Sequence, residues 1–568
     1  MKPESVRPPV AYFSMEVGVD SSIPSYSGGL GVLAGDTLRA AADLGLPVVG
    51  VTLVHRRGYF HQRIDDSGRQ TEAPVRWSVA DELSPTTAKA SVAIDGSEVH
   101  VRAWRRDIVG ANGGIVPVFF LDTDLETNSE AHRRLTDQLY GGDHWNRLRQ
   151  EIVLGIGGVR ILRSLGYSSL SAYHMNEGHS ALLTAELLRE KAFEFGVAID
   201  SPAAANAVKA QCMFTTHTPV AAGHDRFALD MVRSVAGDQA IFARAPAYIR
   251  DGLFDTSRAA LTLSRFANAV SQRHGEVARK MFPEFHIDAI TNGVHGPTWA
   301  CARVAALLDE HVPGWRTNPN ALAGATRIPG EALLAAHDEA KRALVQRVNR
   351  DVNAGLSKHP FTIGIARRAT PYKRLDLILS DHGRLKRIAE VHGPIQIIFS
   401  GKSHPRDAGG KELIERIHTA IRDLSGFVSV CFVPRYDMQL AAMMVAGVDV
   451  WLNCPQRPLE ASGTSGMKAA FNGVPSLSVL DGWWVEGWEE GVTGWAIGED
   501  HPPIAAEREW QEDAAALYEA LETKVLPAFK EPVGWSKVMA NCIARNASRF
   551  NTLRMVHEYA KQWFALAR

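Results

Sequence analysis

Long hydrophobic runs and an excess of one charge are both missing from this 568-residue sequence. No window approaches the roughly 20 consecutive apolar residues that a transmembrane helix needs, and the N-terminus has no apolar signal segment. Lysine and arginine number 62 against 63 aspartates and glutamates, which argues against a polyanion as the main partner. We therefore expect a cytoplasmic protein that binds neither nucleic acid nor a membrane.

A cysteine pattern is missing as well. The five cysteines are odd in number and widely spaced, at Cys212, Cys301, Cys431, Cys454 and Cys542. Zinc sites and disulfide frameworks need closely paired cysteines, so the sequence predicts neither. What is present, 45% hydrophobic residues with mixed charge, is ordinary for a soluble enzyme. The length is too great for one core, so at least two large domains are expected.

Short apolar runs alternate with helical patterns in two successive series. The expected strands are 10–15, 47–55, 115–121, 171–175, 212–216 and 287–291, then 361–366, 395–399, 428–432, 448–452 and 476–480. This alternation predicts an α/β protein with two doubly wound sheets, whose ligands bind at the carboxyl ends of the strands. Two such domains facing each other would enclose a cleft.

Other segments complete the predicted organisation. Residues 88–108 alternate around an Asp-Gly turn and indicate a small antiparallel insertion. The expected divisions are an N-terminal domain at 1–296, a helical connection at 297–358, a C-terminal domain at 359–545 and a last segment at 546–568. Within these, helices are expected at 151–165, 375–379, 507–524 and 549–566.

The stretch from Glu460 to Lys468 follows a predicted buried strand and begins a helix. The small residues at 462–466 would let a phosphate approach free backbone N–H groups, and the helix dipole favours an anion there. Lys468, one turn further, is either an accessory phosphate ligand or an amine that forms a Schiff base. The alternative is a glycine-rich helix cap followed by a surface lysine.

A basic turn follows the first strand of the second series. Four cations, Arg367, Arg368, Lys373 and Arg374, lie within eight residues just outside that strand end. Such a cluster is suited to holding one or two phosphates. The alternative is a solvated basic turn, which the helix predicted at 375–379 disfavours because it would dock the turn on the sheet.

A glycine loop near the N-terminus also suggests phosphate binding. Residues 29–34 fit the dinucleotide pattern G-x-G-x-x-A, but about ten residues separate them from the preceding strand, where that fingerprint needs a tight turn. The next strand ends at His55 without an acidic ribose ligand. A loop whose backbone approaches a phosphate is therefore favoured over NAD(P) binding, with a plain tight turn as the alternative.

Polar residues gather at the predicted strand ends of the first series. They are His174, Asn176, Glu177, His179, His217, Asn292 and His295. The spacing of His174 and His179 does not match a known metal site. We expect Glu177 to orient a neighbouring imidazole. The alternative is a set of satisfied polar residues at a sheet edge.

Taken together, these motifs resemble those of the α-glucan (glycogen, starch, maltodextrin) phosphorylases. The matching stretches are 460–468, 367–374, 290–293, 27–31 and 217–218, and they occur in the family's order. The resemblance implies a glycosyltransferase of the GT-B fold, with two Rossmann-like domains and a C-terminal helix that packs back on the first domain. It also implies a short prokaryotic type that lacks the regulatory N-terminal extension. The resemblance further suggests a homodimer.

The resemblance assigns a role to each motif residue. Lys468 would carry pyridoxal 5′-phosphate as a Schiff base, in a pocket formed by Thr464, Ser465, Arg367 and Trp299. The substrate phosphate would bind Arg368, Lys373 and the backbone at Gly29. The glucosyl unit would be held by Glu460, Ser462, Gly463, Tyr372, Asn292 and His217, with Glu177 near His217. Lys468, Arg368, Lys373 and His217 would act in catalysis.

The implied reaction is cleavage of a terminal α-1,4-glucosyl bond by inorganic phosphate, giving glucose 1-phosphate with retained configuration. The cofactor phosphate and the substrate phosphate would share a proton between them, screened by cations. No glycosidase-type carboxylate pair is then needed, and Glu460 would bind a sugar hydroxyl.

Some positions depart from the family pattern. The family usually has Asp at Glu177 and Lys at Arg367, and residues 140–144 differ where longer members carry a gating loop. Two alternatives stay open. A nucleotide-sugar glucosyltransferase of the glycogen synthase kind would not require Lys468. A catalytically silent glucan-binding protein would not need the set of Lys468, Arg368 and Lys373.

Overall fold

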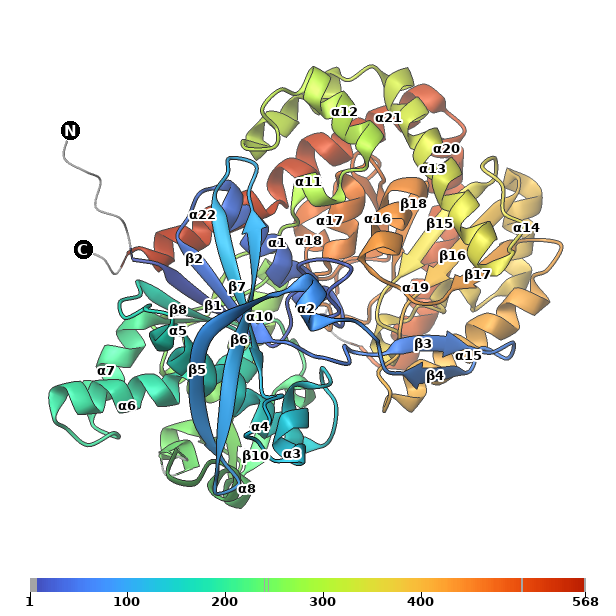
Figure 1. Cartoon of the computed structure of the whole chain (residues 1–568). Helices are drawn as coiled ribbons and strands as arrows, with labels where there is room; N and C mark the ends of the chain where they lie inside the picture. Colours follow the sequence, from blue (N-terminus) through green and yellow to red (C-terminus); the bar gives the residue numbers. More distant parts are fainter. Residues whose placement is uncertain (1–7, 240, 244, 502–503, 566–568) are drawn as a thin grey trace, which may run out of the picture.

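The computed structural model describes residues 8–565 apart from 240, 244, 502 and 503. As predicted, it is an α/β structure, and it is built on two large sheets (Figure 1). One sheet is formed by strands between residues 10 and 289, the other by strands between 361 and 497. Within the described part of the chain, no helix has the length and apolarity needed to cross a membrane.

The first sheet has nine strands. In spatial order they are β14 (Asp288–Ala289), β13 (Phe266–Ala269), β9 (Cys212–Thr215), β8 (Ala172–Asn176), β1 (Val10–Phe13), β2 (Val48–Leu53), β7 (Ile115–Asp122), β6 (Ser97–Val109) and β5 (Ser84–Ile94). From β14 to β7 the pairing is parallel, and from β7 to β5 it is antiparallel. The sheet order reverses at β1, so the ends of β1 and β8 adjoin a switch point where ligands gather.

The hairpin predicted as a small insertion is instead part of this sheet. β6 pairs with β7 along the whole length of β7, from Ile115 to Asp122. Without β6, β7 would be an edge strand with a row of unpaired backbone groups. The long hairpin β5–β6 satisfies those groups and moves the edge outward.

The second sheet has six parallel strands. In spatial order they are β17 (Ser429–Val433), β16 (Ile395–Ser400), β15 (Phe361–Ala366), β18 (Val450–Asn453), β19 (Ser476–Val479) and β20 (Gly494–Ile497). Numbered along the chain this is 3-2-1-4-5-6, the strand order of the Rossmann fold. The switch point lies between β15 and β18, and these two strands precede the basic turn and the 460–468 motif.

The segment between the sheets is helical, as predicted. It contains α11 (Gly296–Trp299), α12 (Ala302–His311) and α13 (Gly330–Val352). The buried side chains of α13, such as Leu344 and Val348, belong to the same hydrophobic core as the second sheet. This connection therefore packs with the second sheet.

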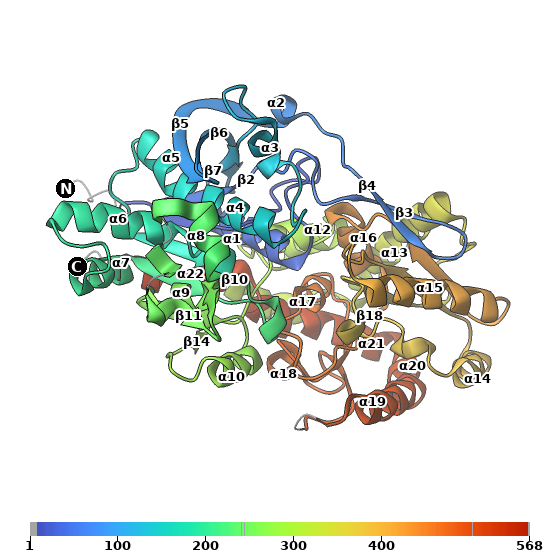
Figure 2. The ribbon, with the colours of Figure 1, turned by 90° about the horizontal axis from the view of Figure 1, so that it is seen from below.

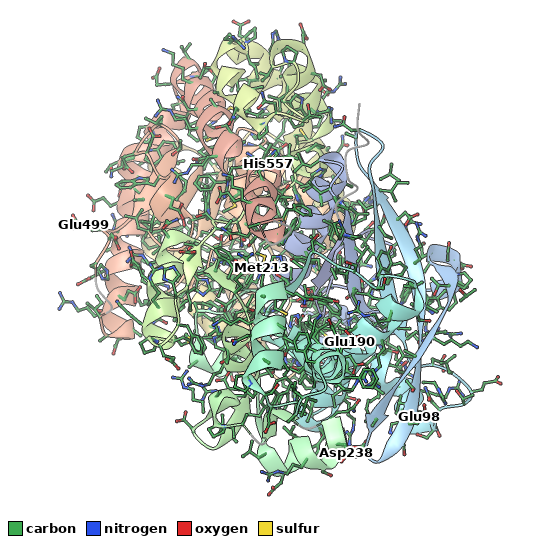
Figure 3. All side chains as sticks on the ribbon, turned by 90° about the vertical axis from the view of Figure 1, so that its left-hand side faces the viewer. Glu98, Glu190, Met213, Asp238, Glu499 and His557 are labelled. Atoms are coloured by element: carbon green, nitrogen blue, oxygen red, sulfur yellow. The ribbon has the colours of Figure 1, made fainter. Side chains whose placement is uncertain are left out.

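The last helix, α22 (Thr552–Trp563), returns to the first sheet. It lies beside α1 (Gly29–Asp43) in Figure 1, and His557 marks it in Figure 3. Its buried Trp563 donates a hydrogen bond of 3.1 Å from Nε1 to Nδ1 of His174. The predicted end of this helix, residue 566, lies outside the described residues.

A second hairpin, β3 (His61–Ile64) and β4 (Gln70–Ala73), was not predicted, because its strands are short and polar. Figures 1 and 2 both show it extending to the second sheet, beside α15 (Ala408–Asp423). Two buried glutamine amides secure it there. Gln62 Nε2 donates to the carbonyl of Gly401 at 2.8 Å, and Gln70 Nε2 donates to that of Ser403 at 2.9 Å.

Two predicted helices have different bounds. The one expected at 375–379 is only a short 3₁₀ turn at Leu377–Leu379. The one expected from residue 151 begins earlier, as α4 (His144–Ile152), because the Asp143 side chain caps it by accepting a hydrogen bond from the Asn146 N–H.

A buried charge cluster joins α13 to the second sheet and predicts a stability effect. Asp449 accepts hydrogen bonds from His337 at 2.9 Å, from Lys341 at 2.5 Å and from the Thr362 N–H at 2.7 Å. Asp449→Ala would leave the Lys341 ammonium buried without a countercharge, and we expect the free energy of unfolding to fall by about 3–5 kcal/mol.

Urea denaturation measures this difference. The matched control is Asp338→Ala, which removes a half-exposed carboxylate of α13 from its ion pairs with Arg342 and Lys358. Pairs of that kind contribute at most about 1 kcal/mol. Equal losses in the two variants would contradict the account of the cluster.

Candidate active site

A cavity of about 740 Å³ opens at the carboxyl ends of both sets of strands. Its walls come from the loops after β1, β8 and β9 of the first sheet and after β15, β16 and β18 of the second. All the residues to which the resemblance assigns a role line this one cavity: Gly29, Glu177, His217, Asn292, Trp299, Arg367, Arg368, Tyr372, Lys373, Glu460, Ser462, Gly463, Thr464, Ser465 and Lys468. Arg374, predicted as a fourth phosphate-holding cation, does not line it, because its buried guanidinium pairs with Asp513 at 2.6 Å.

Lys468 lies on the short helix α17 (Thr464–Ala470), behind the loop that follows β18. Its side chain is buried, with the residue only 7% exposed, and Nζ lies 3.9 Å from the centre of the Trp299 ring. Within the described chain, Nζ has no hydrogen bond or ion pair. Burial lowers the pKa of Lys468 to about 8, although the nearby Asp36 carboxylate opposes this. The amine is thus more readily neutral than an ordinary lysine.

Trp299 is itself fixed by Asp36, a residue that sequence reasoning missed. The indole Nε1 donates to Asp36 Oδ2 at 2.7 Å, and the His295 N–H donates to the same oxygen at 3.2 Å. Asp36 lies on α1, whose neighbouring positions are mostly apolar and buried. A carboxylate on such a helix face was the available signal, because it needs a partner there.

Glu460 holds two of the predicted phosphate ligands together. Its carboxylate forms an ion pair with Arg367 and accepts from Lys373 Nζ at 2.7 Å on both oxygens. Burial works to raise the pKa of Glu460, but the charges of Arg367 and Lys373 outweigh it and lower the pKa to about 2. Arg367 still has donors to offer, since its buried Nε and Nη1 have no partner among the described residues.

Arg368 has a different environment from its neighbour. More than a third of its surface is open, it faces the cavity, and no ion pair or hydrogen bond to it occurs in the described chain. The glycine loop lies close by, because a Cβ on Gly28 would be 3.8 Å from Arg368 Nη2. This loop is shaped by Glu16, another residue missed from the sequence, which accepts the N–H groups of Ser27 and Gly28 at 2.6 and 3.3 Å. The result is an unpaired guanidinium facing small residues.

Glu177 and His217 meet, but not through the imidazole. Glu177 Oε2 accepts from the His217 backbone N–H at 2.7 Å and from the Thr218 hydroxyl at 2.9 Å. The His217 ring instead contacts Asn176 Oδ1 through Nε2 at 2.7 Å. The expectation that Glu177 orients an imidazole is therefore wrong, because its backbone, with a φ of 77°, turns the carboxylate toward the loop after β9. Burial lowers the pKa of His217 to about 3, so the ring is neutral.

His174 and His179 serve the first sheet. His174 contacts Thr215 Oγ1 through Nε2 at 2.8 Å, and His179 Nε2 accepts from the Met15 N–H at 2.9 Å. Their ring nitrogens are thus occupied by different partners. Among residues 8–565, leaving out the four undescribed ones, no group of three or more His, Cys, Asp or Glu side chains is placed to hold a metal ion.

Uncharged polar groups also line the cavity. Asn292 Oδ1 and Ser462 Oγ are buried without a hydrogen-bond partner in the described part of the chain. Buried polar atoms of this kind usually have a partner, so these two are suited to binding a polar ligand. The cavity therefore combines a cationic region around Arg367, Arg368 and Lys373 with neutral hydrogen-bonding groups.

Three other contacts at the site were not predicted from the sequence. Tyr140 donates from its hydroxyl to Glu16 Oε1 at 2.8 Å, and Arg147 pairs with Asp225 at 2.7 Å. Asp481 accepts the Glu460 N–H at 2.8 Å. Burial, together with the charge of Glu460, raises the pKa of Asp481 to about 7. All of these contacts join segments far apart in the sequence, which local patterns do not reveal.

Comparison with known proteins agrees with this geometry. The family model for carbohydrate phosphorylases matches residues 255–495. The chain is 37% identical to the maltodextrin phosphorylase of Thermococcus litoralis, covering 98% of this chain and 71% of that protein. It is 36% identical to the glycogen phosphorylase of Mycobacterium tuberculosis, with coverages of 98% and 71%.

Two further relatives extend the comparison. The glycogen phosphorylase of Aquifex aeolicus is 34% identical, covering 99% of this chain and 87% of that protein. An uncharacterized protein of Methanocaldococcus jannaschii is 29% identical over 98% of this chain and 99% of its own length. The chain belongs to the carbohydrate phosphorylase family and is one of its α-glucan phosphorylases.

Proposed function

We propose that this α-glucan phosphorylase catalyses the reversible, pyridoxal-phosphate-dependent phosphorolysis of terminal α-1,4-glucosyl residues, giving glucose 1-phosphate with retained configuration. The observation that carries the proposal is a buried, unpaired lysine amine in the same cavity as three cations suited to phosphate. A nucleotide-sugar transferase needs the cations but has no use for such an amine.

The fold assigned to this function is GT-B, with two Rossmann-like domains facing across the cavity. The proposed N-terminal domain is 1–296, the helical connection 297–358, the C-terminal domain 359–545 and the returning segment 546–568. The separate sheets and the return of α22 to the first sheet support these divisions. The cytoplasmic location and the homodimer stay predictions.

The pocket around Lys468 fits pyridoxal phosphate. Lys468 would hold the cofactor, Trp299 would lie against it, and Thr464, Ser465 and Arg367 would bind its phosphate. The partnerless nitrogens of Arg367 support this role, since a phosphate would satisfy them. When bound, the cofactor supplies a phosphate group that exchanges a proton with the substrate phosphate.

The substrate phosphate would bind between Arg368, Lys373 and the backbone at Gly29. Arg368 is free to accept it, whereas Lys373 is held by Glu460. An arriving phosphate therefore competes with Glu460 for Lys373, and the Glu460 carboxylate becomes available for a sugar hydroxyl. Cations arranged before the reaction stabilise the negative charge that gathers on two adjacent phosphates.

The glucosyl unit would be held by the neutral groups of the cavity. Asn292 Oδ1 and Ser462 Oγ lack partners and would bind sugar hydroxyls. With a pKa near 3, His217 is neutral at physiological pH, so it would act by hydrogen bonding and not as a charged acid. Tyr372, Gly463 and Glu177 complete this wall.

The pKa of Lys468 predicts how cofactor uptake depends on pH. Only the neutral amine attacks an aldehyde, so the rate at which cofactor-free enzyme captures pyridoxal phosphate should rise about tenfold per pH unit up to pH 8 and then level off. An ordinary lysine would keep rising to about pH 10. Stopped-flow absorbance between pH 6 and 10 measures this profile, and a rate that still climbs steeply above pH 9 would contradict it.

One assay tests the proposed function against its two alternatives. The enzyme is given maltodextrin with inorganic phosphate, or a nucleotide-linked glucose with maltodextrin. We expect glucose 1-phosphate from the first mixture and no chain extension in the second. Transfer from the nucleotide sugar alone would favour the glycogen synthase-like alternative, and binding without any turnover would favour a silent glucan-binding protein.

A further inference from the structure

The cavity contains cations that the proposed function leaves unused. They lie on the basic loop, residues 401–407, which joins β16 to α15. Lys402, His404 and Arg406 of this loop all line the cavity. These three alternate residues thus face the same space as Arg368.

These side chains lack the countercharges that three other cavity cations have. Arg147 is paired with Asp225, and Arg367 and Lys373 are paired with Glu460. By contrast, neither Lys402 nor Arg406 has a side-chain ion pair or hydrogen bond within the described residues. The Phe60 ring lies 5.6 Å from Lys402 Nζ.

The nearby carboxylates are engaged elsewhere. Asp407 and Asp437 cap α15 and α16 (Met438–Gly447) by accepting the N–H groups of Gly410 and Leu440. Glu72 is paired with Lys411 at 2.8 Å. Burial lowers the pKa of Lys402, and the charge of Asp437 opposes this. A half-buried ammonium without a partner is costly unless a ligand supplies the negative charge.

His404 offers a donor to the same ligand. Its Nδ1 accepts from the Arg406 backbone N–H at 3.2 Å, so the neutral ring carries its hydrogen on Nε2. The ring lies 6.2 Å from Tyr59, centre to centre. Burial, with the charges of Arg406 and Arg368, lowers the pKa of His404.

The basic loop is held rigidly beside the phosphate-binding turn. The Ala369 N–H donates to the Lys402 carbonyl at 3.0 Å, which joins the two loops through their backbones. From the other side, the buried Gln62 and Gln70 bind the carbonyls of Gly401 and Ser403. A site whose groups are fixed in advance loses little entropy when a ligand binds.

We propose that Lys402, His404 and Arg406 form a second anion site, next to Arg368, which takes the phosphate group of inorganic phosphate or of a sugar phosphate on its way to the reacting position. The exposed Arg406 would meet the anion first, and Lys402 would pass it to Arg368. The inference rests on the proposed function, which places the reacting phosphate at Arg368. Cations arranged in this way raise the local anion concentration and the rate of association.

Kinetics of the cofactor-loaded enzyme test the proposal. Lys402→Met should raise KM for phosphate about tenfold, as expected for a lost charge-assisted hydrogen bond, and leave kcat and KM for maltodextrin within about twofold. Arg63→Met is the matched control, because Arg63 is an exposed cation of β3 outside the cavity. An unchanged KM for phosphate in Lys402→Met, or a change only in KM for maltodextrin, would overturn the proposal.

Direct binding separates this site from the reaction. In calorimetric titration with inorganic phosphate, Arg368→Ala should still bind one phosphate, and Arg368→Ala with Lys402→Met should bind none. Retained binding in the double variant would overturn the site. If the wild-type enzyme turned over no glucan, the proposed function would fail, while this titration would still decide the anion site. A repeat with glucose 1-phosphate shows whether the site takes phosphate esters as well as the free ion.

Discussion

Lys468→Ala should lose both the near-ultraviolet absorbance of bound pyridoxal phosphate and all phosphorolysis of maltodextrin. The amine of Lys468 is the group that anchors the cofactor in the proposed mechanism, and its buried position on α17 leaves no other lysine in the cavity to replace it, since Lys373 and Lys402 lie on other loops. Without the cofactor phosphate, the substrate phosphate has no proton partner. We expect activity to fall to that of the enzyme-free reaction.

The control for this variant is Lys411→Ala. Lys411 lies on α15, is paired with Glu72 and does not line the cavity. It should keep both the absorbance and the turnover. Circular dichroism would show that Lys468→Ala is folded. Unchanged turnover in a folded Lys468→Ala enzyme would remove the phosphorylase mechanism proposed for this chain.

Arg368→Ala should have the second largest effect. Arg368 is the one cation of the basic turn at 367–374 that faces the cavity without a carboxylate partner, so it is free to bind the substrate phosphate. Loss of one such preorganised charge typically lowers turnover by about 10²–10³-fold. We also expect a higher KM for phosphate, measured as initial rates at varied phosphate and saturating maltodextrin.

Arg368→Lys is the informative companion to that variant. It keeps the charge but loses the planar pair of donors, so partial activity is expected. An effect of Arg368→Ala on the affinity for maltodextrin alone would contradict the role of Arg368 in phosphate binding. So would equal activities of the alanine and lysine variants.

The sequence was sufficient to place the predicted site residues in one cavity. The reason is topological, because parallel strands end at a common edge and the motifs followed predicted strands. The basic turn follows β15 and the 460–468 motif follows β18, the two strands at the reversal of the second sheet. The helical connection was also predictable from its pattern.

Contacts between distant segments could not be predicted in this way. The pairing of Trp299 with Asp36 joins residues 263 apart in the chain, and no local pattern specifies it. The same holds for Tyr140 with Glu16, which are 124 apart. The role of Glu177 was misjudged because its carboxylate direction depends on an unusual φ angle, which the residue type does not reveal.

Local sequence patterns also did not predict which strands form the edges of the sheets. The alternation in 88–108 correctly indicated a hairpin, but pairing of β6 with β7 depends on which edge of the sheet is open. The hairpin β3–β4 was missed because its buried residues are glutamines, and polar residues do not produce the apolar alternation that predicts a strand. Their partners are backbone carbonyls of the basic loop, more than 300 residues away.

The central claim is that Lys468 carries pyridoxal phosphate beside a cationic phosphate site. Reduction of the cofactor-loaded enzyme with borohydride, followed by peptide mass spectrometry, tests it most directly. The account predicts a phosphopyridoxyl group on the peptide that contains Lys468 and on no other. An unmodified Lys468, or the group attached to a different lysine, would contradict it.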